Sequence, residues 1–363
     1  MFGLTSHGLL ALTITVAAVA VAALSALVTR RADTTALSLP RRLVLRTAPV
    51  VVLALLAQAL AVAAVAMSVN DSYGFYTSWA DLLGRPTPET AISTGGLVGS
   101  GQGTARAFTV HAPDGGRNER VLVWTPPQYD APSEATHRLP VVVFLPGQPN
   151  TPAATFRHFR FAETATRLIA AGKVPPFVAV FPTLMIAPPR DTECTNVPGG
   201  PQAETWLERD VPAFVTQHFR VQPPGPGWTA LGWSTGGFCA TKLLTTHPAQ
   251  YSSAVSFGGY YRPLEDGTTG NLFHGDERLE RLNSPLWLYQ RDQRLDRLGH
   301  DRLLLVAGEQ DKETWPQTLR MIKAAATDPA VAHIAFPVGG HNYENYRRYL
   351  PAALAWSASA WPR

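Results

Sequence analysis

The most specific chemical signal in the sequence is a serine flanked by glycines, in the run Gly232-Trp-Ser-Thr-Gly236. An apolar run leads into this motif and a helical stretch follows it, which is the context of a nucleophile elbow. Glycines let such a tight strand-to-helix turn close around a strained residue. A serine hydroxyl is a weak nucleophile until a base takes its proton and a carboxylate orients that base. We therefore expect Ser234 to be a catalytic nucleophile.

Candidates for the base and the acid follow downstream, where predicted strands end. His341 follows two glycines after the apolar run 332–336, in a loop from which an imidazole can reach over the edge of a sheet. The run 303–307 leads into Gly308-Glu-Gln-Asp-Lys-Glu313, so Asp311 and Glu313 are both candidate acids. The order Ser, acid, His is that of α/β-hydrolases, in which the acid lies about three residues after the closing glycine. We predict Asp311 as the acid and keep Glu313 as the alternative.

The elements that must position these residues are visible as alternating short strands and helices from Arg106 onward. Apolar runs such as Pro140–Leu145 and Phe177–Phe181 are uninterrupted by polar residues, which is typical of strands buried on both faces. The helix candidates are 205–219, 235–247, 315–326 and 342–356. This alternation predicts an α/β fold with a doubly wound, mostly parallel sheet over residues 105–363.

Two long apolar runs precede that domain, Gly8–Val28 and Thr47–Val69, and neither contains a charged side chain. As helices, both are long enough to cross the roughly 30 Å hydrocarbon core of a bilayer. Five arginines lie between them, which by the positive-inside rule predicts a cytoplasmic loop and an extracytoplasmic main domain. We thus expect a multi-pass cell-membrane protein with an anchor at 1–70 and a juxtamembrane linker at 71–104. A cleaved signal peptide is the alternative for the first run, although residues 1–7 lack the usual basic side chains.

Charge and composition exclude several classes of partner. The net charge of +4 comes entirely from the segment between the two apolar runs, so the main domain offers no basic face to a nucleic acid. No His, Cys and Asp cluster has the spacing of metal ligands, so we expect neither a metal nor another cofactor. The two cysteines, Cys194 and Cys239, are predicted to form a disulfide in an oxidising compartment, and two separate buried thiols are the alternative.

From Arg106 to Trp361 the sequence resembles the α/β-hydrolase family named Putative esterase, which contains esterase D-like enzymes and the mycobacterial mycolyltransferases. The resemblance rests on Val121-Leu-Val-Trp-Thr-Pro-Pro-Gln-Tyr129, the serine motif, and Gly339-Gly-His-Asn-Tyr343. The arginine-rich, lysine-poor composition also resembles that of actinobacterial proteins. The resemblance implies a serine esterase with an α/β-hydrolase fold that acts on an acyl ester. The predicted anchor would hold the enzyme at the bilayer at a high effective concentration, so we expect lipid or cell-envelope esters as substrates.

Other functions stay open at this point. The mycolyltransferase relatives pass the acyl group to a sugar hydroxyl with the same three residues, so acyl transfer is one alternative. A catalytically inactive hydrolase fold that serves as a binding module is another. For the oxyanion hole, geometry favours the backbone N–H of Thr235, next to the nucleophile. The resemblance adds the backbone N–H of Gln148, in Pro146-Gly-Gln148, although Gln148 as an ordinary surface residue remains an alternative. Residues 264–301 are a candidate lid.

Overall fold

The computed structural model describes residues 7–29, 39–73, 79, 98–112, 117–132, 135–294 and 302–362. The chain divides into two compact units, Met1–Pro86 and Thr87–Arg363. Most of the predicted linker at 71–104 lies outside the described residues, as do Arg30 and Arg31 of the predicted cytoplasmic loop.

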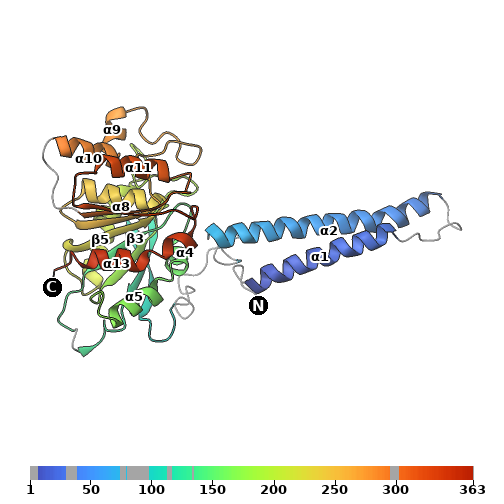
Figure 1. Cartoon of the computed structure of the whole chain (residues 1–363), viewed down its shortest axis with the longest axis horizontal. Helices are drawn as coiled ribbons and strands as arrows, with labels where there is room; N and C mark the ends of the chain where they lie inside the picture. The colour runs from blue at the N-terminus through green and yellow to red at the C-terminus, as the bar shows by residue number, and fades with distance from the viewer. Residues whose placement is uncertain are drawn as a thin grey trace. The chain divides into compact units, whose positions relative to one another are not determined.

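In the first unit, the described residues form two long helices, α1 (His7–Thr29) and α2 (Leu39–Tyr73), which pack along each other (Figure 1). The stretches Gly8–Leu27 and Thr47–Val69 are long and apolar enough to cross a membrane. Large apolar side chains project outward along both helices, and Val19 and Val62 are 62% and 70% exposed. A helix that is apolar on all sides and uncovered by protein is unfavourable in water.

The second unit is built on a sheet in which the described residues form eight strands, in the order β1-β2-β4-β3-β5-β6-β7-β8. The two strands at one edge, β1 and β2, run antiparallel to their neighbours, and all pairs from β4 to β8 are parallel. The strands are β1 (Thr104–Ala112), β2 (Arg117–Thr125), β3 (Val141–Leu145), β4 (Val178–Pro182), β5 (Gly225–Trp233), β6 (Tyr251–Phe257), β7 (Arg302–Gly308) and β8 (Val331–Phe336). The carboxyl ends of β3, β5, β7 and β8 therefore lie at one edge of the sheet.

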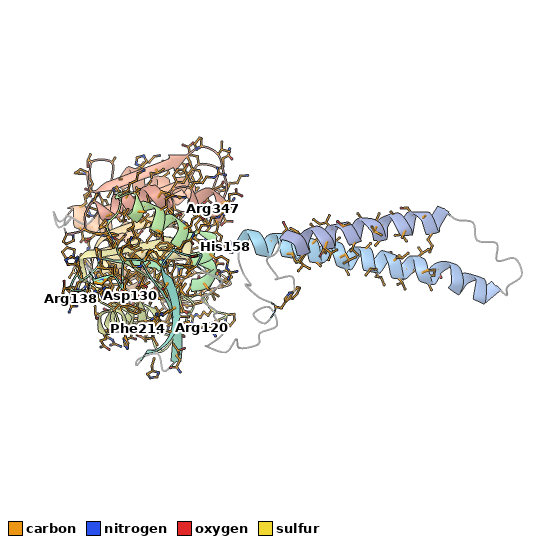
Figure 2. The ribbon with its side chains drawn as sticks, turned by 90° about the horizontal axis from the view of Figure 1, so that it is seen from below. Arg120, Asp130, Arg138, His158, Phe214 and Arg347 are labelled. Atoms are coloured by element: carbon orange, nitrogen blue, oxygen red, sulfur yellow. A yellow bond between two sulfur atoms is a disulfide. The ribbon has the colours of Figure 1, made fainter. Side chains whose placement is uncertain are left out.

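Helices cover both faces of this sheet (Figure 1). One layer contains α6 (Ala203–Thr205), the π-helical turn η4 (Trp206–Asp210), α7 (Val211–His218), α8 (Thr235–Thr246), α9 (Glu277–Leu282), α10 (Pro285–Arg294) and α11 (Trp315–Ala324). The other contains α4 (Pro152–His158), α5 (Phe161–Ala170), α12 (Tyr343–Arg347) and α13 (Leu350–Ala358). In Figure 2, His158 and Arg347 mark α4 and α12, which contact each other.

The central strand β3 shows why the sheet needs two layers. Its five side chains are fully buried, and successive residues point to opposite faces: Val141, Val143 and Leu145 join the core under α8, whereas Val142 and Phe144 join the core under α5 and α13. The expected doubly wound α/β-hydrolase fold is therefore confirmed.

The predicted helix 342–356 is interrupted. Pro351 lacks an N–H and its ring would clash with the carbonyl of Arg347 one turn earlier, so α12 ends at Arg347 and α13 begins at Leu350 with this proline in its first turn. The predicted helix 205–219 likewise begins with the wider turn η4 before α7.

Candidate active site

Ser234 lies in the turn between β5 and α8, and its backbone is strained. Its φ and ψ angles are 56° and −121°, which is an unusual conformation for a residue with a side chain. The glycine two positions earlier permits this turn, since a Cβ on Gly232 would lie 1.9 Å from the carbonyl oxygen of Gly236. The backbone N–H of Ser234 donates to the carbonyl of Phe257 at the end of β6, which fixes the turn on the sheet. The serine thus lies on a rigid elbow at the carboxyl edge.

His341 lies in the loop between β8 and α12, within hydrogen-bond distance of Ser234. Its Nε2 is 2.9 Å from Ser234 Oγ. The imidazole stacks on the Trp233 ring, with centroids 4.3 Å apart, and the side chain of Asn342 caps α12 by accepting from the N–H of Asn345. The ring and the following residue are therefore both held in place, and the imidazole is aligned to take a proton from the serine hydroxyl.

Asp311 holds the other nitrogen of this imidazole. Its Oδ2 is 2.6 Å from His341 Nδ1, and the same oxygen accepts from Tyr346 Oη at 2.6 Å and from Thr314 Oγ1 at 2.8 Å. Its Oδ1 accepts from the backbone N–H groups of Glu313 and Thr314. Burial alone would raise the pKa of Asp311, but these hydrogen bonds, with that of His341 foremost, outweigh it and lower the pKa to about 2. Asp311 is therefore a buried carboxylate rather than a carboxylic acid at neutral pH.

The alternative acid, Glu313, has a different position. Its side chain is exposed, and only its backbone N–H contributes to the site, by donating to Asp311. The structure thus brings Ser234, His341 and Asp311 into one hydrogen-bonded chain.

The loop after β3 runs beside the serine. A Cβ on Gly147 would lie 3.0 Å from Ser234 Cβ, so this loop and the elbow are packed as closely as glycine allows. Gln148 follows directly and is half-buried. Within the described parts of the chain, the backbone N–H groups of Gln148 and Thr235 donate to no acceptor. Both N–H groups are thus available to bind an anionic oxygen near Ser234.

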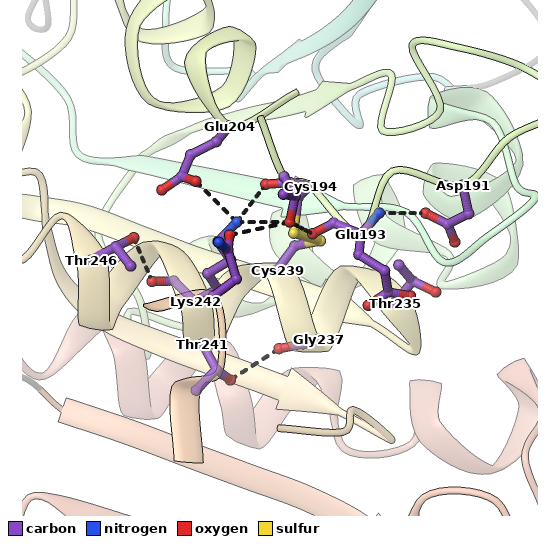
Figure 3. The surroundings of a disulfide bond; sticks show 12 residues. Asp191, Glu193, Cys194, Glu204, Thr235, Gly237, Cys239, Thr241, Lys242 and Thr246 are labelled. Carbon is purple, nitrogen blue, oxygen red and sulfur yellow. Dashed lines mark hydrogen bonds and ion pairs between the residues drawn. A yellow bond between two sulfur atoms is a disulfide. The ribbon is translucent and has the colours of Figure 1, made fainter. Parts of the chain in front are cut away.

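A disulfide joins Cys194 to Cys239, as predicted, and ties the loop at 191–196 to α8 (Figure 3). A second tie lies one turn further along α8, where Lys242 Nζ donates to the carbonyl of Cys194 at 2.8 Å. Lys242 is buried, which lowers its pKa, and it pairs with Glu204 at 3.0 Å. This ion pair offsets the burial of Glu204 and lowers the pKa of that carboxyl to about 2.

Two tyrosines near the site were not among the residues predicted from the sequence. Tyr346 donates to Asp311 from α12, and burial and the Asp311 charge raise its pKa, so it remains a donor. Tyr260 contacts the hydroxyl of Thr235 from the segment after β6. The aromatic residues downstream of His341 were a hint for Tyr346, but nothing in the sequence indicated Tyr260. Among the residues that the structure describes, no group of three or more His, Cys, Asp and Glu side chains could hold a metal ion.

Comparisons with known proteins identify the family of this chain and similar folds. The family model described as Putative esterase matches residues 113–357. An uncharacterized protein of Corynebacterium glutamicum is 28% identical over 245 residues, which are 65% of this chain and 56% of that protein, so the match spans little more than half of the relative's length.

Three solved structures share the fold. A ferulic acid esterase superposes with a TM-score of 0.61 at 16% identity, covering 71% of this chain and 98% of that one. An S-formylglutathione hydrolase from Agrobacterium tumefaciens gives 0.60 at 16% identity, covering 73% and 98%. MPT51 of Mycobacterium tuberculosis gives 0.55 at 16% identity, covering 70% and 98%.

Proposed function

This chain belongs to the Putative esterase family, and we propose that it is a serine hydrolase that cleaves carboxylic esters outside the cytoplasm, anchored in the cell membrane by α1 and α2. The observation that carries the proposal is the hydrogen-bonded chain from Ser234 through His341 to Asp311. A strained serine, an imidazole and a buried carboxylate in this order are the parts that acyl transfer through a covalent intermediate requires.

In the first half of the proposed reaction, Ser234 Oγ attacks the ester carbonyl carbon while His341 Nε2 takes the hydroxyl proton. The carbonyl electron pair moves onto oxygen, and the resulting oxyanion is bound by the backbone N–H groups of Thr235 and Gln148. Asp311 stabilises the imidazolium through Nδ1. Collapse of the tetrahedral intermediate breaks the bond to the alcohol, which leaves with the proton from His341, and Ser234 carries the acyl group.

In the second half, a water molecule attacks the acyl group while His341 takes a proton from it. Collapse of the second tetrahedral intermediate releases the carboxylic acid and returns the proton to Ser234 Oγ. Transfer to the hydroxyl of a sugar or lipid follows the same steps with that hydroxyl in place of water. The assay must therefore separate hydrolysis from acyl transfer.

The membrane anchor is supported by the exposure of the apolar side chains on α1 and α2. Burying these side chains in a bilayer removes their apolar surface from water, which is favourable by about 25 cal/mol of free energy per Å² buried. The orientation rests on the five arginines of the intervening segment and the positive-inside rule. An anchored enzyme meets esters of the membrane or the cell envelope at a high effective concentration, and we propose such esters as substrates.

The test is an ester panel presented to the full chain in detergent or in vesicles. The wild type should hydrolyse esters in a series of increasing acyl-chain length, and Ser234→Ala should hydrolyse none of these esters. A parallel series with a sugar or glycerol acceptor, with products resolved by mass spectrometry, distinguishes free acid from a transferred acyl group. Absence of turnover on every ester, with and without acceptor, would contradict the proposal.

A further inference from the structure

The loop at 191–196, beside the site, is attached to one face of α8 at three positions. Thr235, Cys239 and Lys242 lie four and three residues apart, so they share one side of the helix that begins at the serine. Cys239 and Lys242 hold the loop by the disulfide and by the hydrogen bond to the Cys194 carbonyl. The third attachment, at Thr235, is made by the side chain of Glu193 through Tyr260.

Glu193 lies where a carboxyl group has a high energetic cost. It is 1% exposed, and its Oε2 has no hydrogen-bond partner among the described residues. Glu193 and Cys194 also adopt left-handed backbone conformations, with φ angles of 48° and 45°, that residues with side chains rarely adopt. Burial and the neighbouring Asp191 raise the pKa of Glu193. Costs of this kind persist where the surroundings over-determine the conformation, and they cluster at functional sites.

In this position, Glu193 is connected by a hydrogen-bonded bridge to Thr235, the residue after the nucleophile. Tyr260 Oη lies 2.5 Å from Glu193 Oε1 and 3.2 Å from Thr235 Oγ1. A phenol has one proton, so it donates to one neighbour and accepts from the other, which makes the three groups a single chain of hydrogen bonds. The Tyr260 ring is itself fixed, since it stacks on Phe238 with centroids 5.0 Å apart.

We propose that Glu193 is a positioning residue that acts through Tyr260 on Thr235 and so sets the direction of the Thr235 N–H toward the oxyanion. The proposal rests on the function proposed above. Thr235 is the first residue of α8 and follows the strained Ser234, so a small rotation of its peptide moves the N–H. An oxyanion donor must lie about 2.7–3.1 Å from the oxygen in the transition state, and a side-chain tether on the same residue limits that rotation.

The test is a double-mutant cycle on the full chain, with Tyr260→Phe and Thr235→Val as the two single changes. Each removes one hydroxyl of the bridge and keeps the shape of the side chain. Removing an oxyanion donor costs about 100-fold or more in kcat, so a misdirected donor should cost about 10-fold, with KM changed by less than about 2-fold. Because both changes break the same bridge, the double variant should be no slower than either single variant.

The matched control is Tyr261→Phe. Tyr261 is as fully buried as Tyr260, but its hydroxyl bonds Ser256 and lies outside the bridge. This variant should lose stability in thermal denaturation without the loss in kcat. A kcat loss in Tyr261→Phe as large as that in Tyr260→Phe would overturn the proposal. Additive kcat losses in the double-mutant cycle, or an unchanged kcat in Tyr260→Phe and Thr235→Val, would overturn it as well.

Glu193 provides the second arm if Tyr260→Phe does not fold. Glu193→Ala should show the same selective loss of kcat, and Glu193→Gln, which keeps an acceptor for Tyr260, should recover at least half of the lost rate. Equal losses in the two variants would refute the role of Glu193. Covalent labelling of wild-type Ser234 by a fluorophosphonate is measured alongside. If Ser234 is not labelled, the proposed function is contradicted. If Ser234 is labelled but the kcat losses in the double-mutant cycle are additive, only the role of the bridge is contradicted.

Discussion

Replacing Asp311 by Asn keeps the size of the side chain and removes its charge. In the folded protein, Asp311 accepts hydrogen bonds from His341, Tyr346 and Thr314. An amide offers one acceptor oxygen where the carboxylate has two, and its NH2 group would face donors. His341 would then lose the partner that holds its Nδ1 as a donor, and its Nε2 would no longer be fixed as the acceptor for the Ser234 hydroxyl.

The expected loss of activity is about 10⁴-fold in kcat, the cost of a wrong imidazole tautomer in such a triad. Stability should fall as well. The folded-state pKa of Asp311 is about 2, compared with an ordinary value of 3.8, and this difference corresponds to about 2 kcal/mol of stability. Because the pKa is lowered by folding, this contribution is complete above pH 3.8 and is lost as the pH falls through about 2.

The assay combines steady-state kinetics on a soluble ester with urea unfolding at several pH values. Asp311→Asn should be less stable than the wild type by about 2 kcal/mol at pH 7, and the gap should narrow below about pH 4. Glu313→Gln is the matched control, since that side chain is exposed, and its kcat should stay within about 2-fold of the wild type. Near-normal turnover in Asp311→Asn with a large loss in Glu313→Gln would refute the assignment of the acid.

Three further predictions address the disulfide, the oxyanion loop and the membrane topology. Replacing both cysteines by serine opens a bridge between positions 45 residues apart, which should cost about 4 kcal/mol in urea unfolding, and an unchanged midpoint would contradict this value. Gln148→Ala should keep kcat/KM within about 3-fold, because only the backbone N–H is used, whereas a loss of about 100-fold would assign the role to the side chain. Protease added to intact cells stripped of their wall should cut the chain in the segment 71–104, and full protection of the main domain would reverse the proposed orientation.

Several parts of this site were predictable because they depend on local sequence. Ser234 and His341 are marked by glycines at the ends of apolar runs, and parallel strands bring such ends to one edge of a sheet. The disulfide was predictable because the chain has only two cysteines, and it is confirmed. Asp311 was harder to distinguish from Glu313, since only the fold shows which carboxylate is buried.

The bridge from Glu193 to Thr235 could not be predicted, because its members are far apart in the sequence and neither Glu193 nor Tyr260 lies in a recognisable motif. Tyr260 follows β6, whereas Glu193 belongs to a loop without regular secondary structure. Their contact depends on how the loop is tied to α8, and that is a property of tertiary packing. The break between α12 and α13 did have a local signal. The predicted helix 342–356 treated Pro351 as an interior residue, although a proline ends a helix or begins a new one.

The most direct test of the proposed function is the identity of the nucleophile. The full chain, treated with a fluorophosphonate probe and digested, should yield a single modified peptide with the adduct on Ser234, and Ser234→Ala should remain unlabelled while keeping the thermal stability of the wild type. An adduct on another serine, or no adduct on the folded wild-type protein, would contradict the assignment of Ser234 and with it the proposed hydrolase.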